Sequence, residues 1–220
     1  DDPYNFIIDV NNIPMDSVLE NALLDKQKRV YKSFQPAGLA SGIINVSRSQ
    51  TGDVNYSADI NFADASIKTD FLENQVTNIT ANAIISPDSA VVKSLSGNYG
   101  DMPIMLSGRF MSQVEDQLCY DVSLNLKKVR LNDKELQSLL PESIKKTVQN
   151  FDPNGITDMT LDLKKLNPEK PVEYNVSMNC LGNSIYLKDF DCQVTDVTGL
   201  MKIDGNNIKL KNVTAFLDNN

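Results

Sequence analysis

The thiol side chains in this sequence, which could act as nucleophiles or as soft metal ligands, are those of Cys119, Cys180 and Cys192. The chain contains no histidine, which excludes the Ser-His-Asp and Cys-His arrangements of nucleophilic catalysis and the HExxH zinc site. The cysteines form no CxxC pair, so their spacing predicts neither a zinc site nor a disulfide framework. Asp and Glu pairs occur, but no spacing distinguishes a general acid from a general base. We therefore expect no enzyme activity, no cofactor and no bound metal.

The charge of the chain narrows the choice of partners. The formal net charge is −8, and Lys and Arg are dispersed along the sequence, which argues against nucleic acid and against adsorption to an anionic membrane. The sequence starts at Asp1-Asp2-Pro3 with no signal peptide and holds no run of 18 apolar residues. We expect any membrane anchor to lie outside these 220 residues.

The sequence repeats itself with an offset of 116 to 118 residues. Five anchors recur in order: Tyr4 and Tyr120, Phe34 and Phe151, Tyr56 and Tyr174, Ser66 and Ser184, Val76 and Val194. Such periodicity is typical of a supersecondary unit duplicated in tandem. The sequence therefore predicts a first repeat unit over residues 1–115 and a second over residues 116–220.

Each copy changes its hydrophobic period in the same place. Residues 4–10 and 120–127 alternate apolar and polar side chains, as a half-buried strand does. Helical periodicity follows, and we expect helices near residues 16–33 and 133–149, capped by Asp16 and by Asn132 or Asp133. A Phe-x-Pro-x-Gly sequence then ends each helix, because proline cannot continue it and glycine permits a turn.

The rest of each copy alternates with period 2 between short polar turns and predicts an antiparallel strand meander. The predicted fold is mainly β with one helix per repeat (α+β), as two tandem strand–helix–meander units that form a curved sheet or an open β-groove. The strand predicted over residues 103–110 has no counterpart before Asn220. We expect the second unit to be truncated before its last strand.

Alternation makes each predicted sheet apolar on one face, and that face needs a cover. Five strands about 4.8 Å apart span roughly 24 Å, whereas a helix is about 10 Å across. One helix per repeat thus covers less than half of its sheet. The remainder packs against another sheet, curls on itself, or stays open to an apolar ligand.

The order of strand, amphipathic helix, Phe-x-Pro-x-Gly turn and meander resembles the AsmA-like and TamB-like family of bacterial envelope proteins. The sequences Val76-Thr-Asn-Ile-Thr-Ala and Leu95-Ser-Gly-Asn-Tyr-Gly100 are similar to that family in their pattern of residues. The second copy departs from the pattern, with Thr214-Ala215-Phe216-Leu217 in place of Ser96-Gly97-Asn98-Tyr99. The resemblance implies a protein tethered to the inner membrane that projects a hydrophobic β-groove into the periplasm and moves phospholipid in outer-membrane biogenesis.

The leading hypothesis is a non-enzymatic lipid-handling or lipid-transfer module of the cell envelope, with a phospholipid or other acyl-chain ligand and with other envelope proteins as further partners. The candidate groove-lining residues are Tyr56, Ile60, Phe62, Tyr174, Val176 and Met178. The alternative is a structural or adhesive β-repeat with a closed core, which binds proteins through loops such as Ser49-Gln50-Thr51-Gly52. A contiguous exposed apolar stripe favours the first hypothesis, and a dry closed core favours the second.

Overall fold

Alternating apolar and polar residues form long strands, as the period-2 pattern predicts. The computed structural model describes residues 3–23, 25–51, 53–70, 72–112, 118–140, 144–145, 152–188, 191–204 and 207–218. The described strands are β1 Tyr4–Pro14, β2 Ala37–Arg48, β3 Val54–Ile67, β4 Val76–Ile85, β5 Ser89–Tyr99, β6 Met102–Ser112, β7 Leu118–Arg130, β8 Ile156–Lys165, β9 Glu173–Leu187, β10 Cys192–Asp204 and β11 Asn207–Asp218. The prediction of a mainly β chain is therefore confirmed.

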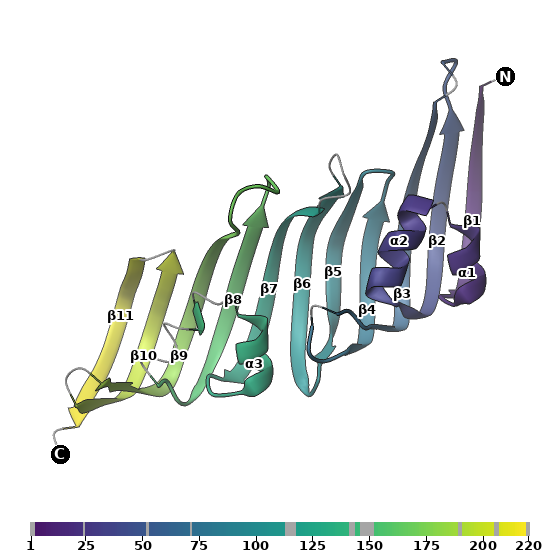
Figure 1. Ribbon diagram of the computed structural model, residues 1–220. Helices are drawn as coiled ribbons and strands as arrows, with labels where there is room; N and C mark the ends of the chain where they lie inside the picture. The colour runs from purple at the N-terminus through teal and green to yellow at the C-terminus, as the bar shows by residue number, and fades with distance from the viewer. Residues whose placement is uncertain are drawn as a thin grey trace. The chain divides into compact units, whose positions relative to one another are not determined.

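The eleven described strands form one antiparallel sheet whose strand order follows the chain from β1 to β11 (Figure 1). Each inner strand therefore pairs with the strand before it and the strand after it. The strands β1 and β11 each have one neighbour in the sheet and form its two edges.

The expected single helix of the first copy is wrong: this segment holds two helices, α1 (Ser17–Ala22) and α2 (Asp25–Phe34). Asp16 caps α1 as predicted, since its carboxylate accepts the backbone N–H groups of Val18 and Leu19. The break lies at Leu23, whose extended backbone conformation ends α1.

The second copy begins its helix where the sequence predicts. Asp133 caps α3 (Lys134–Leu139) by accepting the backbone N–H of Glu135. Leu140 ends α3 in an extended conformation, at the position equivalent to Leu23. Ile144 and Lys145 are again helical. The remainder of the predicted helix and the anchor Phe151 lie outside the described residues.

Contacts divide the chain into two compact units, and each is considered by itself. The first contains Asp1–Asp101, Met105–Val122 and Lys164–Pro171, and the second contains Met102–Ile104, Ser123–Leu163 and Val172–Asn220. The repeat boundary between residues 115 and 116 remains a prediction.

The hydrogen-bond register of the strands repeats with an offset of 118 residues. In the first copy Val76 faces Tyr99 and Ile85 faces Ala90 across β4 and β5. In the second copy Val194 faces Leu217 and Ile203 faces Ile208 across β10 and β11. The pairs Ala58–Ile85 and Val176–Ile203 match in the same way across β3–β4 and β9–β10. Equivalent residues of the two copies therefore occupy equivalent places in the sheet.

Unusual backbone conformations recur with the same period. Five positions of positive φ in the first copy have counterparts 116 to 118 residues later: Asn12 and Lys128, Gln35 and Asp152, Gly38 and Gly155, Asp64 and Gly182, Asn78 and Asp196. Asn12, Asp64, Asn78 and Asp196 coincide with shifts in strand register. These are β-bulges, where one extra residue is accommodated by a left-handed conformation that Asn and Asp tolerate.

Gly38 and Gly155 combine positive φ with a close approach to the next strand. A Cβ atom on Gly38 would lie 2.6 Å from the Cα atom of Ala65, and one on Gly155 would lie 2.7 Å from Nδ2 of Asn183. Asn183 is buried, donates to the carbonyl of Ile156 at 2.9 Å and accepts the backbone N–H of Leu181 at 3.0 Å. The glycine of each Phe-x-Pro-x-Gly sequence thus allows the start of one strand to approach the next strand closely.

We predict that Gly38→Ala and Gly155→Ala each lower the free energy of unfolding by about 3 kcal/mol, since backbone strain and overpacking act together. The matched control is Gly182→Ala, where φ is +85° but nothing lies within 4 Å of the added Cβ. Strain alone makes its cost about 1–2 kcal/mol. Urea denaturation of the three variants measures the difference. Equal losses would contradict the proposed close approach.

Candidate functional site

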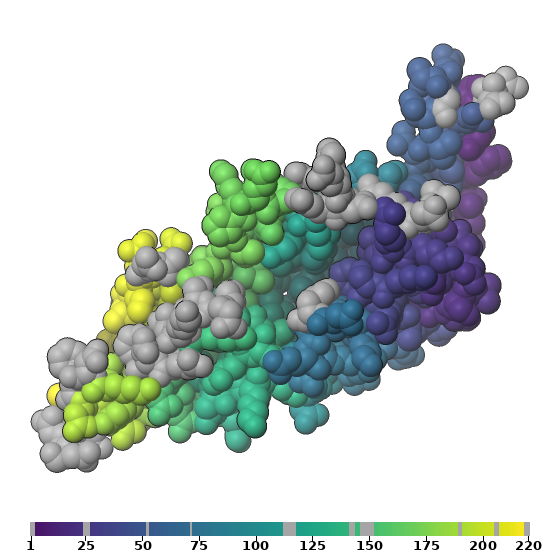
Figure 2. Space-filling model, viewed as in Figure 1, coloured from purple at the N-terminus to yellow at the C-terminus, as the bar shows by residue number. Residues whose placement is uncertain are grey.

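The helices of the first unit cover only part of its apolar sheet face. In Figure 1 α2 lies in front of β3, and its side chains hide that part of the strand in Figure 2. Gln27 Nε2 on α2 donates to Tyr56 Oη on β3 at 3.0 Å. Ala58 and Ile60, on the same face as Tyr56, are buried. This part of the face is a packed core.

The apolar face becomes exposed from β3 toward the edge strand β1. Phe6, Val46 and Tyr56 are register partners in one row, and Ile8, Ile44 and Ala58 are partners in the next. Phe6 is 57% exposed and Ile8 is 47% exposed, whereas Val46 and Ile44 are half-buried. Phe6, Ile8, Ile44 and Val46 form what we call the β1 patch.

The second unit repeats this gradient toward its own edge strand. Val176, Ile203 and Ile208 are register partners in one row, and Met178, Met201 and Leu210 in the next. Val176, Met178 and Ile203 are buried, whereas Ile208 is 45% exposed and Leu210 is 59% exposed. We call Met201, Ile208 and Leu210 the β11 patch.

The second unit also has buried apolar residues on its helix and on its inner strands. Leu136 on α3 and Leu140 directly after it are buried, as are Leu126 on β7 and Leu161 on β8. A helix with a buried leucine beside buried strand residues is the expected way to cover an apolar sheet face. The two units thus share one pattern, a dry centre with an exposed apolar margin.

The six residues predicted to line a groove fall into two groups. Ile60, Val176 and Met178 are buried, and Tyr56, Phe62 and Tyr174 are half-buried. The structure places Tyr56, Ile60 and Phe62 on β3 and the other three on β9. The buried three have little surface to offer a ligand in this conformation.

The more exposed residues Phe6, Ile8, Ile208 and Leu210 were not among the predicted lining residues. Their period-2 spacing marks them as apolar-face residues but gives no strand order. Their exposure follows from membership of β1 and β11, the edges of the sheet.

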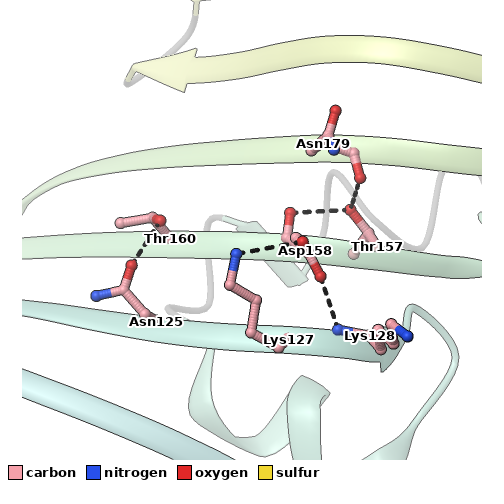
Figure 3. Close-up of polar contacts among 7 residues, drawn as sticks. All are labelled: Asn125, Lys127, Lys128, Thr157, Asp158, Thr160 and Asn179. Atoms are coloured by element: carbon pink, nitrogen blue, oxygen red, sulfur yellow. Dashed lines mark hydrogen bonds and ion pairs between the residues drawn. The ribbon is translucent and has the colours of Figure 1, made fainter.

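The opposite face of the sheet carries hydrogen-bonded polar pairs, shown for β7 and β8 in Figure 3. Thr160 Oγ1 donates to Asn125 Oδ1 at 2.9 Å, and Lys127 Nζ lies 3.2 Å from Asp158 Oδ2. The backbone N–H of Lys128, a residue of positive φ, donates to the other oxygen of Asp158 at 2.9 Å. These pairs make that face the hydrated side of the second unit.

The first unit has a comparable cluster around Asp59. Asn82 Nδ2 donates to one oxygen of Asp59 at 3.0 Å, and Lys93 Nζ donates to the other at 2.9 Å. The bond from Lys93, with that from Asn82, holds the pKa of Asp59 below its usual value of 3.8. A hollow of about 500 Å³ beside this cluster is lined by residues including Asp9, Asn61 and Asn82. None of the six predicted lining residues borders it.

The three cysteines carry free thiols. Cys119 and Cys180 are buried and Cys192 is half-buried, and burial raises the pKa of the Cys180 thiol. Within the described ranges no group of three Cys, Asp or Glu residues is placed to hold a metal ion. No helix among these residues has the length and apolar content needed to cross a membrane.

Comparisons with known proteins give this chain no relatives: no family model, curated protein or solved structure matches it.

We predict that Asp158 contributes to stability at neutral pH and loses this contribution in acid. The Lys128 backbone N–H, followed by the Lys127 ammonium group, holds the pKa of Asp158 below its usual value of 3.8. The contribution is therefore complete above the unfolded-state pKa and disappears as the pH falls through the lower folded-state pKa. Urea titrations between neutral pH and pH about 3 should show a shallower acid loss for Asp158→Asn than for the wild type. The control is Thr160→Val, which removes a neighbouring uncharged hydrogen bond and should leave the pH dependence of the free energy of unfolding as in the wild type. If Asp158→Asn also kept the wild-type pH dependence, the prediction would be wrong.

Proposed function

We propose that this chain is a non-enzymatic lipid-handling module in which an acyl chain lies on the exposed margin of the apolar sheet face. The supporting observation is the gradient from buried to exposed apolar residues along two register rows in each unit. We further propose that it belongs to a longer AsmA-like or TamB-like envelope protein, located in the periplasm and tethered to the inner membrane by a segment outside these residues. This assignment rests on the sequence resemblance alone.

The two faces of the sheet suit the two parts of a lipid. An acyl chain placed on the β1 patch removes apolar surface from water, at about 25 cal/mol per Å². Burial of a few hundred Å² therefore provides several kcal/mol before ordering costs are subtracted. The polar residues of the other face, including Asp59, Asn82 and Lys93, keep that side in water. A head group remains hydrated at the border between them.

Among the predicted lining residues, Tyr56 is the one that connects the packed core to the β1 patch. Its ring is half-buried, its hydroxyl accepts a hydrogen bond from Gln27, and its row partner is the half-buried Val46. A ligand on the β1 patch would lie against Val46 and the exposed edge of this ring. Ile60 lies on the same face of β3 and is buried.

The alternative is a structural or adhesive β-repeat, and one observation favours it. Ile60, Val176 and Met178 are all buried, as a closed core requires. In this case partners bind outer loops such as Ser49–Asp53, where Ser49 and Thr51 share a 2.7 Å hydrogen bond and Thr51 donates to Asp53 at 2.8 Å. Gly52 of this loop lies outside the described residues. The two functions differ in whether an exposed patch residue affects lipid binding.

We predict that Phe6→Lys weakens binding of a fluorescent fatty acid about tenfold, because burying such a side chain contributes about 1.5–3 kcal/mol. The melting temperature of the Phe6→Lys variant should change little, since the ring of Phe6 is mostly exposed. Ile60→Lys should instead unfold the protein, because it places an unpaired charge in the core.

The control for this experiment is Val18→Lys, an exposed apolar residue on α1 outside the β1 patch. It should alter neither fatty-acid affinity nor melting temperature. If Phe6→Lys and Val18→Lys bind equally well, or if the wild type does not bind, the lipid-handling function is wrong and the structural repeat is the better assignment.

A further inference from the structure

The sequence places one of its asparagines directly before a glycine. Asn154 precedes Gly155, whereas none of the other asparagines is followed by glycine. An asparagine side chain loses ammonia when the next backbone nitrogen attacks its carbonyl carbon, and a glycine leaves that nitrogen unhindered because it has no Cβ atom. Asn154 is exposed, so solvent has access to its amide group.

The structure holds the two reacting groups of this pair close together. The backbone N–H of Gly155 donates to Oδ1 of Asn154 at 2.8 Å. Oδ1 is bonded to Cγ, the carbon that the nitrogen attacks, and the torsion about the Cβ–Cγ bond of asparagine is soft enough to turn this carbon toward the nitrogen. Reactants held at such short distances react faster, because part of the entropic cost of bringing them together is already met.

A polar hollow borders the same side chain. It has a volume of about 330 Å³, and the residues that line it include Asp152, Asn154 and Tyr186 of the second unit. These three residues are exposed. Solvent water, which the second step of the reaction consumes, therefore has a path to the amide group of Asn154.

The first copy of the repeat shows that the fold does not require an asparagine at this position. Gly38 has a φ of +117° and Gly155 a φ of +115°. The carbonyl groups of the two glycines each accept a backbone N–H, at 2.9 and 3.1 Å. The residue before Gly38 is Ala37. Asn154 therefore adds a reactive amide to a backbone arrangement that forms without one.

We propose that Asn154 is a site of spontaneous deamidation in the folded protein. The nitrogen of Gly155 forms a bond to Cγ of Asn154, the bond from Cγ to Nδ2 breaks, and Nδ2 leaves as ammonia with the proton of the Gly155 N–H. Water then opens the resulting succinimide ring at either of its carbonyl groups. The product is an aspartate or an isoaspartate, and each carries a carboxylate that the asparagine lacks. This proposal is independent of lipid binding.

The isoaspartate product alters the backbone at a closely packed position. It adds one carbon atom to the main chain before Gly155, where an added Cβ atom would already lie 2.7 Å from Nδ2 of Asn183. The backbones of Asn154 and Ser184 exchange two hydrogen bonds of 2.9 Å each. Because the longer main chain displaces these groups, we expect the isoaspartate form to lose both hydrogen bonds.

The first test is incubation of the whole chain at mildly alkaline pH, followed by intact-mass measurement and peptide mapping. The wild type should gain the mass difference between an amide and a carboxylic acid, located at Asn154. The gain should be at least as fast in the native protein as in urea, because the native geometry already holds the reacting groups together. Asn154→Ala should abolish this gain and keep the wild-type melting temperature, as Ala37 in the first copy indicates.

Hydrogen exchange tests the structural consequence. The amide of Ser184 should exchange about tenfold faster in the isoaspartate fraction, separated by ion exchange, than in fresh protein. The matched control is Asn154→Asp, which carries the new charge without the added main-chain carbon and should keep the wild-type exchange rate at Ser184.

Three outcomes would overturn the proposal. The first is a mass gain in the native protein that arises at another asparagine before Asn154. The second is slower deamidation of Asn154 in the native protein than in urea. The third is exchange at Ser184 that is unchanged in the isoaspartate fraction, or equally fast in Asn154→Asp.

Discussion

An antiparallel sheet with one apolar face needs a cover on that face, and the rest of this structure depends on how incompletely its helices supply one. A helix is about 10 Å wide and strands lie about 4.8 Å apart, so each helix covers about two strands. The rows from Ala58 to Ile8 and from Val176 to Ile208 agree with this geometry, since they are buried on the inner strands β3 and β9 and exposed on the edge strands β1 and β11. The apolar margins remain exposed because each unit has more strands than its helices are wide enough to cover.

The two copies of the repeat share this incomplete cover and much of their strand geometry. The registers of β3–β4 and β9–β10 match, those of β4–β5 and β10–β11 match at both ends of the pair, and the left-handed residues Asn78 and Asp196 place a bulge in equivalent strands. Each bulge reverses the alternation beyond it, so apolar residues stay on the covered face only because their spacing shifts there as well. Two copies that agree in such detail indicate that the bulges are part of the repeat and not local irregularities.

The sequence predicts the strands and helix starts well because their signals are local. Alternation identifies β3 and β9, and the carboxylates of Asp16 and Asp133 cap the first helix of each copy. The break at Leu23 was missed, because nothing in its residue type opposes a helix and only its extended backbone shows the end of α1.

The candidate site was less predictable for a different reason. Ile60 and Ile8 have the same local pattern, yet one lies on an inner strand and the other on an edge, and this difference depends on strand order. A period-2 pattern identifies the apolar face but does not tell which part of it is covered. The predicted residues therefore include buried Ile60 and Val176, whereas exposed Phe6 and Leu210 are found from the structure.

We propose that an acyl chain occupies the exposed margins of the apolar face and not its buried centre. The most direct test is methyl NMR of the protein with a lysophospholipid that carries a nitroxide on its acyl chain. We expect strong broadening of the methyl signals of Ile8, Ile44 and Leu210, while those of Ile60 and Val176 stay sharp. Strongest broadening at Ile60 and Val176, or no selective broadening at any methyl group, would contradict it.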